Sequence, residues 1–207
     1  MEIISFRVYG IRKRKPKNTV ILKRLYELAQ NFQGDFEVLI SRLKDIVGEF
    51  CSDREFQNRL ISTEFYEAIS ENDLNYLFWQ YENYLRRTEY LEDAPIEFRE
   101  YTGLSIEHII SQVPREIAAW MDERFWGNYL HSIGNLTLDL SWENSAKSNH
   151  SFDFKYKYFY QNARFRCQQE LITFTNSDSS EWDETSITKR QTKIVNFAMM
   201  YWDYQSR

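Results

Sequence analysis

Several features that mark other protein classes are scarce in this sequence. Only six glycines and three prolines occur in 207 residues, about 4% of the chain against roughly 12% in average usage. Since turns depend on these residues, the sequence predicts few turns and long elements, which favours a mostly helical fold over a many-stranded sandwich or barrel. Hydrophobic residues make up 43% and aromatic residues 17%, enough for a core, so disorder over most of the length is not expected.

Signals for membranes, secretion and structural zinc are also missing from the sequence. No apolar run approaches the roughly 20 residues that cross a bilayer, and the first ten residues lack the basic and then apolar pattern of a secretory signal. The two cysteines, Cys51 and Cys167, form no Cys-x-x-Cys pair, so neither a disulfide framework nor a zinc site is expected. These absences predict a cytoplasmic protein with reduced thiols and no membrane partner.

Positive charge is not in excess. The 26 basic and 31 acidic residues give a formal net charge of −5. A chain with this balance does not resemble a general nucleic-acid coat, so any binding to DNA must use local patches.

Two clusters of basic residues are candidates for such patches. Near the N-terminus, Arg12 and Arg14 belong to a basic run without acids, for which a solvated linker is the alternative. Five more basic residues are interleaved with aromatic ones between positions 144 and 166: Lys147, Lys155, Lys157, Arg164 and Arg166. The alternative for this second cluster is an amphipathic helix whose aromatic side is buried.

Helical spacing of apolar residues dominates most of the chain. The predicted helices cover residues 21–32, 36–50, 74–91 and 185–204. Asp35 is placed to cap the second of these, and Ser70, with Asp73 three residues later, marks the start of the third. The apolar stretch from Ile3 to Tyr9 is instead interpreted as a strand or extended segment.

The stretch from 104 to 155 has a different pattern. Residues 104–110 begin with strand-like alternation, and residues 134–140 alternate apolar and polar side chains as a half-buried strand does. Between them, residues 114–126 suggest a helix with Pro114 at its first position. Ser141 is then placed to cap a helix that contains Asn144. The predicted order is strand, inserted helix, strand, helix.

Polar residues recur in a fixed order along this stretch. Glu107 and His108 stand together at the end of the first predicted strand, and Asn144 stands near the start of the last helix. This order resembles the HNH branch of the His-Me finger nucleases and, more narrowly, the C-terminal domain of GmrSD-type restriction endonucleases. The matching elements are Glu107-His108-Ile109, Trp120 or Trp126, Gly134 to Leu138, Asn144, Ser148-Asn149, Phe152 and Lys155.

The resemblance implies a fold, a reaction and residue roles. It implies a mostly α (α+β) fold, a helical bundle with an inserted ββα-metal motif, and a metal-dependent DNA endonuclease. His108 matches the general base that activates water. Glu107 and Asn144 match the ligands of Mg²⁺ or Mn²⁺. Asn135 matches the residue that supports the finger, while Lys147 and Lys155 would contact phosphate.

Each of these roles has a structural alternative. His108 and His131 can be hydrogen-bonded structural histidines, Glu107 an ordinary surface carboxylate, and Asn135 and Asn144 simple turn or helix-start residues. Many relatives have proline where Ser111 stands here, which leaves open a catalytically degenerate finger that binds DNA or a protein. A nuclease that acts on RNA is a third hypothesis.

The resemblance also implies partners and an organisation of the chain. Relatives usually carry an NTP-hydrolysing domain that senses modified DNA, such as modified phage DNA, and no phosphate-binding loop of that kind occurs here. The sensor is therefore expected in a longer chain or a partner subunit of a restriction or anti-phage defence system. One compact domain is expected, made of a basic segment or linker (1–18), a helical region (19–100), the ββα-metal core (101–166) and a C-terminal helical region (167–207).

Overall fold

The computed structural model describes residues 1–13, 19–91, 93–98, 103–175 and 181–206. The chain divides into two compact units: unit 1 comprises Met1–Leu60 and Met199–Arg207, and unit 2 comprises Ile61–Ala198. Residues 104–166 all lie in unit 2, together with the helices on both sides of them in the sequence.

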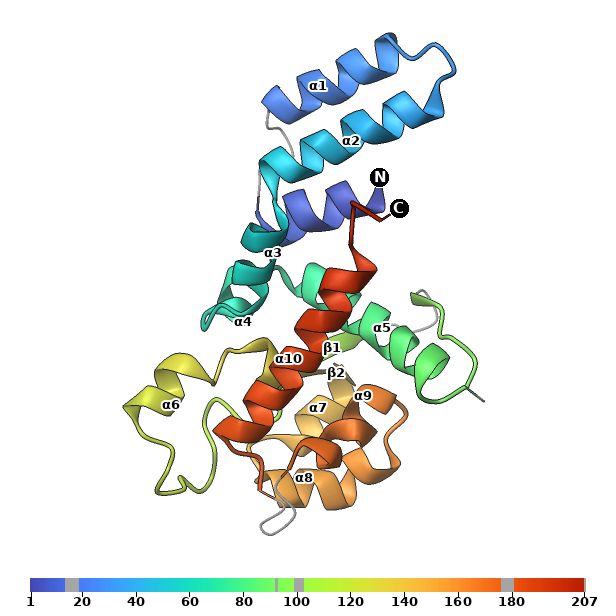
Figure 1. The fold of residues 1–207 in the computed structure, drawn as a ribbon. Coiled ribbons are helices and arrows are strands. Elements are labelled where there is room, and N and C mark those ends of the chain that lie inside the picture. The colour runs from blue at the N-terminus through green and yellow to red at the C-terminus, as the bar shows by residue number, and fades with distance from the viewer. Residues whose placement is uncertain (14–18, 92, 99–102, 176–180, 207) are drawn as a thin grey trace. The chain divides into compact units, whose positions relative to one another are not determined.

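Unit 1 contains helices in its described residues (Figure 1). They are η1 (Ile4–Ile11), α1 (Thr19–Gln30), α2 (Phe36–Phe50) and α3 (Asp53–Leu60). The helix predicted over 36–50 is confirmed, and the Asp35 side chain caps it by accepting a hydrogen bond from the Val38 N–H at 3.0 Å.

The prediction of a strand over residues 3–9 is wrong, because residues Ile4–Ile11 form the π-helix η1. A short apolar run fits a buried helix as well as a strand, and tertiary contacts favour the helix here. Phe6 stacks on Trp202 at 3.9 Å between ring centroids. The buried Arg7 guanidinium donates to the backbone oxygens of Cys51 and Trp202, at 3.1 and 3.2 Å.

Unit 2 consists mainly of helices around one small sheet. Its helices are α4 (Phe65–Ala68), α5 (Glu71–Thr88), α6 (Glu123–Asn128), η3 (Ile133–Asn135), α7 (Ser141–Lys147), α8 (Phe152–Tyr158), η4 (Tyr160–Asn162), α9 (Arg166–Gln169), η5 (Glu170–Phe174) and α10 (Glu184–Tyr201), whose last residues belong to unit 1. The start signal at Ser70 is confirmed, since its side chain accepts from the Asp73 N–H at 3.2 Å. The mostly helical class predicted from composition is therefore confirmed.

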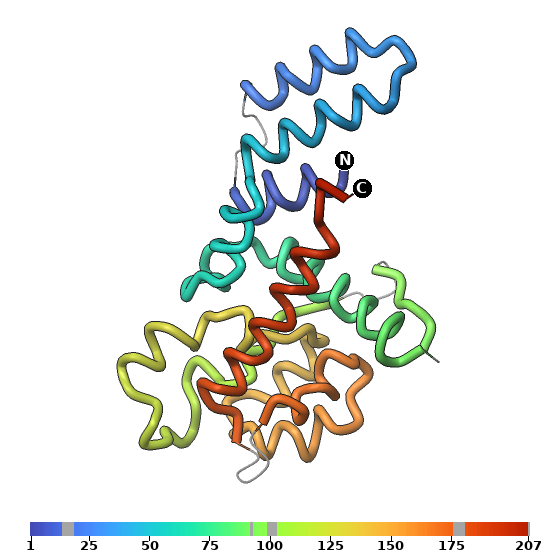
Figure 2. Tube along the Cα trace, in the orientation of Figure 1, coloured from blue at the N-terminus to red at the C-terminus, as the bar shows by residue number. Residues whose placement is uncertain are grey.

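The sheet has two antiparallel strands in the described residues, β1 (Leu104–His108) and β2 (Leu136–Leu140). Leu104 pairs with Leu140, and His108 pairs with Leu136. Figure 2 shows that the long connection between the strands loops away from the sheet before it returns through α6. Helix α7 follows β2 directly, so the predicted order of strand, insertion, strand and helix is confirmed.

The helix expected over 114–126 is wrong for most of its length. The structure has only α6, whose N-cap is Asp122, with its side chain accepting from the Phe125 N–H at 3.0 Å. The segment before α6 contacts a distant loop. The backbone N–H of Arg115 donates to the Asn149 carbonyl at 3.1 Å and its Nε to the Asn149 side chain at 2.8 Å.

Ser141 does not cap α7 as expected. It is the first residue of the helix, and its hydroxyl donates to the Gly103 carbonyl at 2.8 Å, as does its backbone N–H. Ser141 therefore connects the start of α7 to the residue that precedes β1, and it closes the open end of the hairpin.

Gly134 explains part of the motif that follows the insertion. A Cβ atom at this position would lie 2.1 Å from the Ile187 carbonyl oxygen of α10. The buried Arg190 of α10 donates to the Gly134 carbonyl at 3.1 Å. Because backbone packs directly on backbone here, glycine is required for β2 to lie against α10.

Among the described residues, no helix is long and apolar enough to span a bilayer.

Candidate functional site

Asn135 joins the two ends of the insertion between the strands. Its Nδ2 donates to the Leu130 and Ile110 carbonyls at 2.9 and 3.1 Å, and its Oδ1 accepts from the Ile110 N–H at 2.9 Å. The side chain is fully buried. These bonds fix the backbone two residues after His108.

Glu107 lies within a buried ion pair. Its Oε1 accepts from Lys155 Nζ at 2.6 Å, and the same ammonium donates to the His108 and Ile109 carbonyls at 2.9 and 3.2 Å. Burial raises the pKa of Glu107, although the charge of Lys155 opposes the shift. Lys155 is fully buried, and its ammonium holds the end of β1 in place.

A second buried ion pair lies on the same side of the sheet. Ser105 pairs with Asp139, so both side chains share a face with Glu107, two residues along β1. Lys147 Nζ donates to both oxygens of Asp139, at 2.8 and 2.7 Å, and both residues are fully buried. We call the set formed by Glu107, Asp139, Lys147 and Lys155 the paired-charge cluster. Its two carboxylates and two ammonium groups balance.

This cluster corrects an expectation about the two lysines. Lys147 and Lys155 were candidates for contact with phosphate, but the ammonium groups of both are held inside the protein by carboxylates. They stabilise the packing of α7 and α8 on the sheet and do not belong to the exposed basic surface.

Asn144 lies on α7 beside β1 and is partly exposed. Its Nδ2 donates to Ser105 Oγ and to the Ile106 carbonyl, both at 3.2 Å. The amide is therefore on the side of the sheet that carries Glu107. The structure thus brings the two predicted metal ligands to one face of β1.

His108 faces the other way, because successive side chains of a strand alternate. Its Nε2 lies 3.3 Å from His131 Nδ1, and its Nδ1 lies 3.3 Å from Gln112 Nε2. The Tyr66 ring packs edge-on against the imidazole at 4.5 Å between centroids. Burial lowers the pKa of His108 to about 3, with smaller contributions from His131 and Lys155. The imidazole is therefore neutral at neutral pH.

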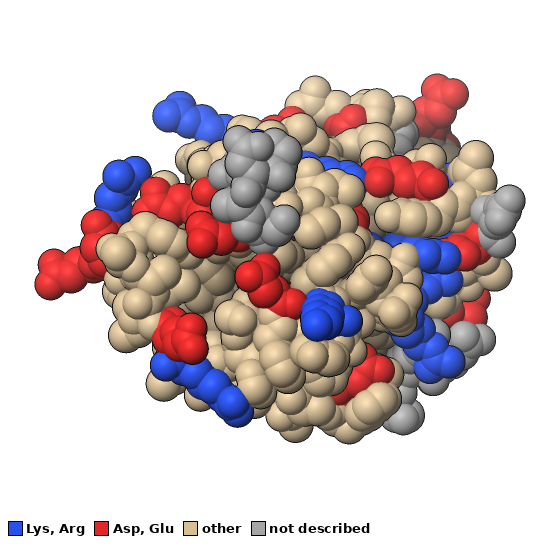
Figure 3. Space-filling view, turned by 90° about the horizontal axis from the view of Figure 1, so that it is seen from below, with Lys and Arg blue, Asp and Glu red and all other residues tan. Residues whose placement is uncertain are grey.

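The remaining candidate DNA contacts have different environments. Lys157 and Arg164 are exposed, whereas Arg166 is partly buried and binds Asp93, whose pKa it lowers. Arg12 is partly buried in unit 1 and pairs with Glu55, and Arg14 lies outside the described residues. The face in Figure 3 mixes basic and acidic side chains around a broad uncharged area. Of the five basic residues expected to form a local patch between 144 and 166, Lys157 and Arg164 are exposed, and the other three pair with carboxylates.

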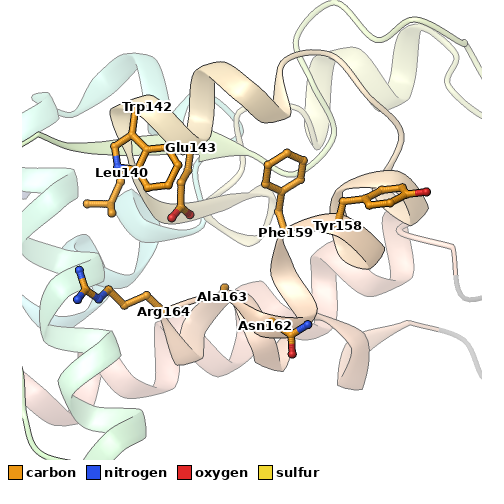
Figure 4. Close-up of a pocket in the computed structure, with 8 residues that line it drawn as sticks. All are labelled: Leu140, Trp142, Glu143, Tyr158, Phe159, Asn162, Ala163 and Arg164. Carbon is orange, nitrogen blue, oxygen red and sulfur yellow. The ribbon is translucent and has the colours of Figure 1, made fainter.

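A surface hollow of about 650 Å³ is lined in part by Arg164. Figure 4 shows Trp142 and Glu143 on one side of it, and Tyr158, Phe159 and Arg164 around the rest. Trp142 and Tyr158 are 69% and 60% exposed, and Lys157 Nζ lies 5.2 Å from the Tyr158 ring centroid. Exposed aromatic rings next to cations can stack on bases and contact phosphates.

Sequence reasoning missed some residues that the structure brings to the site. Tyr66 and Gln112 contact His108, and Asp139 holds Lys147. Asp139 gave a signal, since a carboxylate inside a Leu-rich strand needs a buried partner. Tyr66 gave none, because it is 42 positions before His108 and only the fold brings them together.

The fold defines a class before any comparison is made: a helical domain whose strand–insertion–strand–helix unit carries a histidine at the end of its first strand. The family model for the C-terminal domain of GmrSD restriction endonucleases matches residues 50–197. Since this match covers more than half of the chain, the protein belongs to that family, and the resemblance inferred from the motifs is confirmed. No curated protein matches the chain.

Family membership gives the general activity, which is that of restriction endonucleases, and hence DNA as the class of substrate. It does not assign roles to residues. Among the described residues, no group of three or more His, Cys, Asp or Glu side chains is placed to hold a metal ion.

Proposed function

We propose that the protein is a metal-dependent DNA endonuclease of the HNH type that hydrolyses phosphodiester bonds, with His108 as its general base. The system served would be a bacterial restriction or anti-phage defence acting in the cytoplasm. The observation that carries this proposal is the position of His108. It ends β1 in a chain of this family. Its neutral imidazole contacts His131 and Gln112, and neither of these partners is a carboxylate.

A neutral imidazole suits the role of general base because it has a lone pair that can take a proton from water. The low pKa of free His108 reflects burial. A bound phosphodiester brings a negative charge close to the ring, and a nearby negative charge raises the pKa of an imidazole. His108 thus becomes a stronger base when substrate is present, which is when water must be activated.

The oxygen donors for a divalent cation are Glu107 and Asn144. Carboxylate and amide oxygens on the same face of β1 suit Mg²⁺, which needs only one or two protein ligands besides water and phosphate oxygens. Lys155 binds Oε1 of Glu107, and the carboxylate has a second oxygen. Bound Mg²⁺, or Mn²⁺ in its place, would stabilise negative charge on the phosphate and on the leaving oxygen.

Contact with DNA is assigned to the exposed residues of the second half of unit 2. Lys157 and Arg164 supply positive charge, and Trp142 and Tyr158 supply exposed rings. Such a surface provides local binding in a protein whose net charge is −5. Recognition of modified phage DNA is assigned to an NTP-dependent sensor, in a longer chain or a partner subunit.

One observation favours a second candidate function. Lys155 already neutralises Glu107, and a divalent cation binds more weakly to a carboxylate that an ammonium group has neutralised. A protein in which this pair never opens would bind DNA or a partner without cutting. An RNA-directed nuclease on the same site is distinguished by competition between RNA and DNA substrates.

The test is nicking of supercoiled plasmid with Mg²⁺, Mn²⁺ or EDTA. Wild type and His108→Ala are compared at equal concentration, with His150→Ala as a control that removes a histidine elsewhere. We expect metal-dependent nicking by wild type and His150→Ala, and its loss in a folded His108→Ala variant. A folded His108→Ala variant with full activity would contradict the proposal, and DNA binding without any nicking, on modified phage DNA as well, would favour the binding module.

A further inference from the structure

We propose that His131 is a positioning residue that fixes the ring orientation and the tautomer of His108. This inference rests on the proposed role of His108 in the reaction, but the contacts that carry it are independent of that role. They form a line of side chains from Gln112 through the two imidazoles to Glu67.

The two imidazoles are close and nearly perpendicular. Nε2 of His108 lies 3.3 Å from Nδ1 of His131, and the rings meet at 86° with 5.4 Å between centroids. This geometry joins ring nitrogen to ring nitrogen and does not stack the rings. In a pair of neutral imidazoles such a contact is a hydrogen bond only when one nitrogen carries the proton and the other does not.

The ends of the line decide which nitrogen carries the proton. Gln112 Nε2 is a donor, so Nδ1 of His108 accepts and its proton lies on Nε2. That Nε2–H donates to His131 Nδ1, which leaves the proton of His131 on its own Nε2. Glu67 Oε1 lies 3.7 Å from that nitrogen, beyond hydrogen-bond distance. The two contacts of His108, with Gln112 and with His131, then each join a hydrogen to a lone pair.

His131 is itself held in place by helix α4. Its ring stacks on the Tyr66 ring at 5.8 Å with an interplanar angle of 13°, and its carbonyl accepts from the Tyr66 N–H at 3.1 Å. The same Tyr66 ring packs edge-on against His108. Both imidazoles are therefore oriented by one aromatic side chain, which limits how far either ring can rotate.

The arrangement specifies which atom of His108 works as the base. With the proton on Nε2, the lone pair is on Nδ1, next to the exposed Gln112 side chain in the loop after β1. A water to be activated takes the place of the Gln112 amide at Nδ1. Loss of the contact with His131 frees the ring to adopt the other tautomer, in which Nδ1 is protonated and cannot accept.

Two substitutions separate positioning from simple packing. His131→Phe keeps a ring to stack on Tyr66 but removes the acceptor for His108 Nε2–H. His131→Asn removes the ring but can place its side-chain oxygen where Nδ1 was. We expect kcat for plasmid nicking to fall about 10- to 100-fold in the phenylalanine variant, the usual cost of losing a partner that orients an imidazole. KM for DNA should change little, and the asparagine variant should recover most of the rate.

The tautomer is measured directly by ¹⁵N NMR of the imidazole nitrogens. The chain has only three histidines, so single substitutions assign all three rings. We expect the Nε2–H tautomer for His108 in wild type and in His131→Asn, and a mixture of tautomers in His131→Phe. A folded His131→Phe variant with unchanged tautomer and kcat would overturn the inference.

The wild-type spectrum alone also tests the inference, so it stays open to refutation even if the phenylalanine variant does not fold. An Nδ1–H tautomer of His108 in the wild-type protein would contradict it. Because this readout needs no DNA, it separates the two proposals. Full activity in His108→Ala would contradict the proposed role of His108 as general base. The measured tautomer of His108 would still test whether His131 orients its ring.

Discussion

The two sides of strand β1 differ sharply, although Glu107 and His108 are neighbours in the chain. On the side of Glu107, the paired-charge cluster joins carboxylates to ammonium groups at 2.6 to 2.8 Å. On the side of His108, the imidazole contacts the imidazole of His131 and the amide of Gln112, at 3.3 Å each. The first side has short contacts between charged groups that hold helices on the sheet, and the second has longer contacts at the ring nitrogens of His108.

This difference suggests how the strand serves both stability and reaction. A buried ion pair is strongly destabilised when one partner is removed, so the side of Glu107 resists change. A neutral imidazole with long hydrogen bonds can exchange a partner for a water at small cost. Lys155 connects the two sides, because its ammonium also donates to the carbonyl of His108.

The largest expected effect comes from breaking the paired-charge cluster. Lys155→Met leaves the carboxylate of Glu107 buried without its partner, so we expect the free energy of unfolding to fall by about 3–5 kcal/mol. Urea denaturation measures this loss. Lys157→Met is the matched control, because Lys157 is exposed on the same helix and should change stability by less than about 0.5 kcal/mol. Equal losses of unfolding free energy in the two variants would show that the buried ion pair does not stabilise the protein more than an exposed lysine does.

An intermediate effect is expected from acid on the side of His108. The pKa of His108 is about 3 in the folded protein and about 6.5 in an unfolded chain. Between these values the unfolded chain binds more protons, so the stability present above pH 6.5 is lost as the pH falls toward 3, by at most about 1.4 kcal/mol per pH unit.

This acid dependence is isolated by comparison with His108→Gln. The raised pKa of Glu107 acts in the opposite direction, since the folded state then binds more protons than the unfolded one. Both proteins share that contribution, so it cancels in the difference. We expect the stability of His108→Gln to fall less steeply than that of wild type in urea unfolding curves from pH 7 to 4. Parallel curves would mean that His108 is not held neutral by burial.

The smallest effect is expected at the exposed cations. Lys157→Ala and Arg164→Ala should leave stability within about 0.5 kcal/mol of wild type. Each should weaken DNA binding and reduce the slope of log affinity against log salt concentration by about one, as loss of one phosphate contact does. Fluorescence anisotropy with a labelled duplex at several salt concentrations measures both changes. An unchanged slope would remove these residues from the DNA-binding surface.

The features that local pattern fixes were predictable from sequence. Spacing of apolar residues and the capping side chains at Asp35 and Ser70 located α2 and the start of α5. Alternation located both strands, and the order of Glu107, His108 and Asn144 pointed to the correct family. Such signals are local, because they depend only on residues a few positions apart.

Other predictions failed where distant contacts override local preference. The stretch 3–9 is helical because Trp202, nearly 200 positions away, packs on Phe6. The segment after Pro114 is irregular, and Arg115 in it is hydrogen-bonded to Asn149, 34 positions away. The local helix or strand propensity of a segment does not reflect contacts with residues that only the fold brings close.

The sequence by itself determined the helical class, the strand–insertion–strand–helix order, the family and the candidate residues, since these depend on composition, on periods of two and 3.6 residues and on a motif in fixed order. Only the tertiary structure decided what those residues face. In the structure, Lys147 and Lys155 are buried and pair with carboxylates. His131 and Tyr66 contact His108. The physical reason is that the role of a buried charged or polar side chain depends on its partner. Here the partners lie from 8 to 48 positions away in the chain.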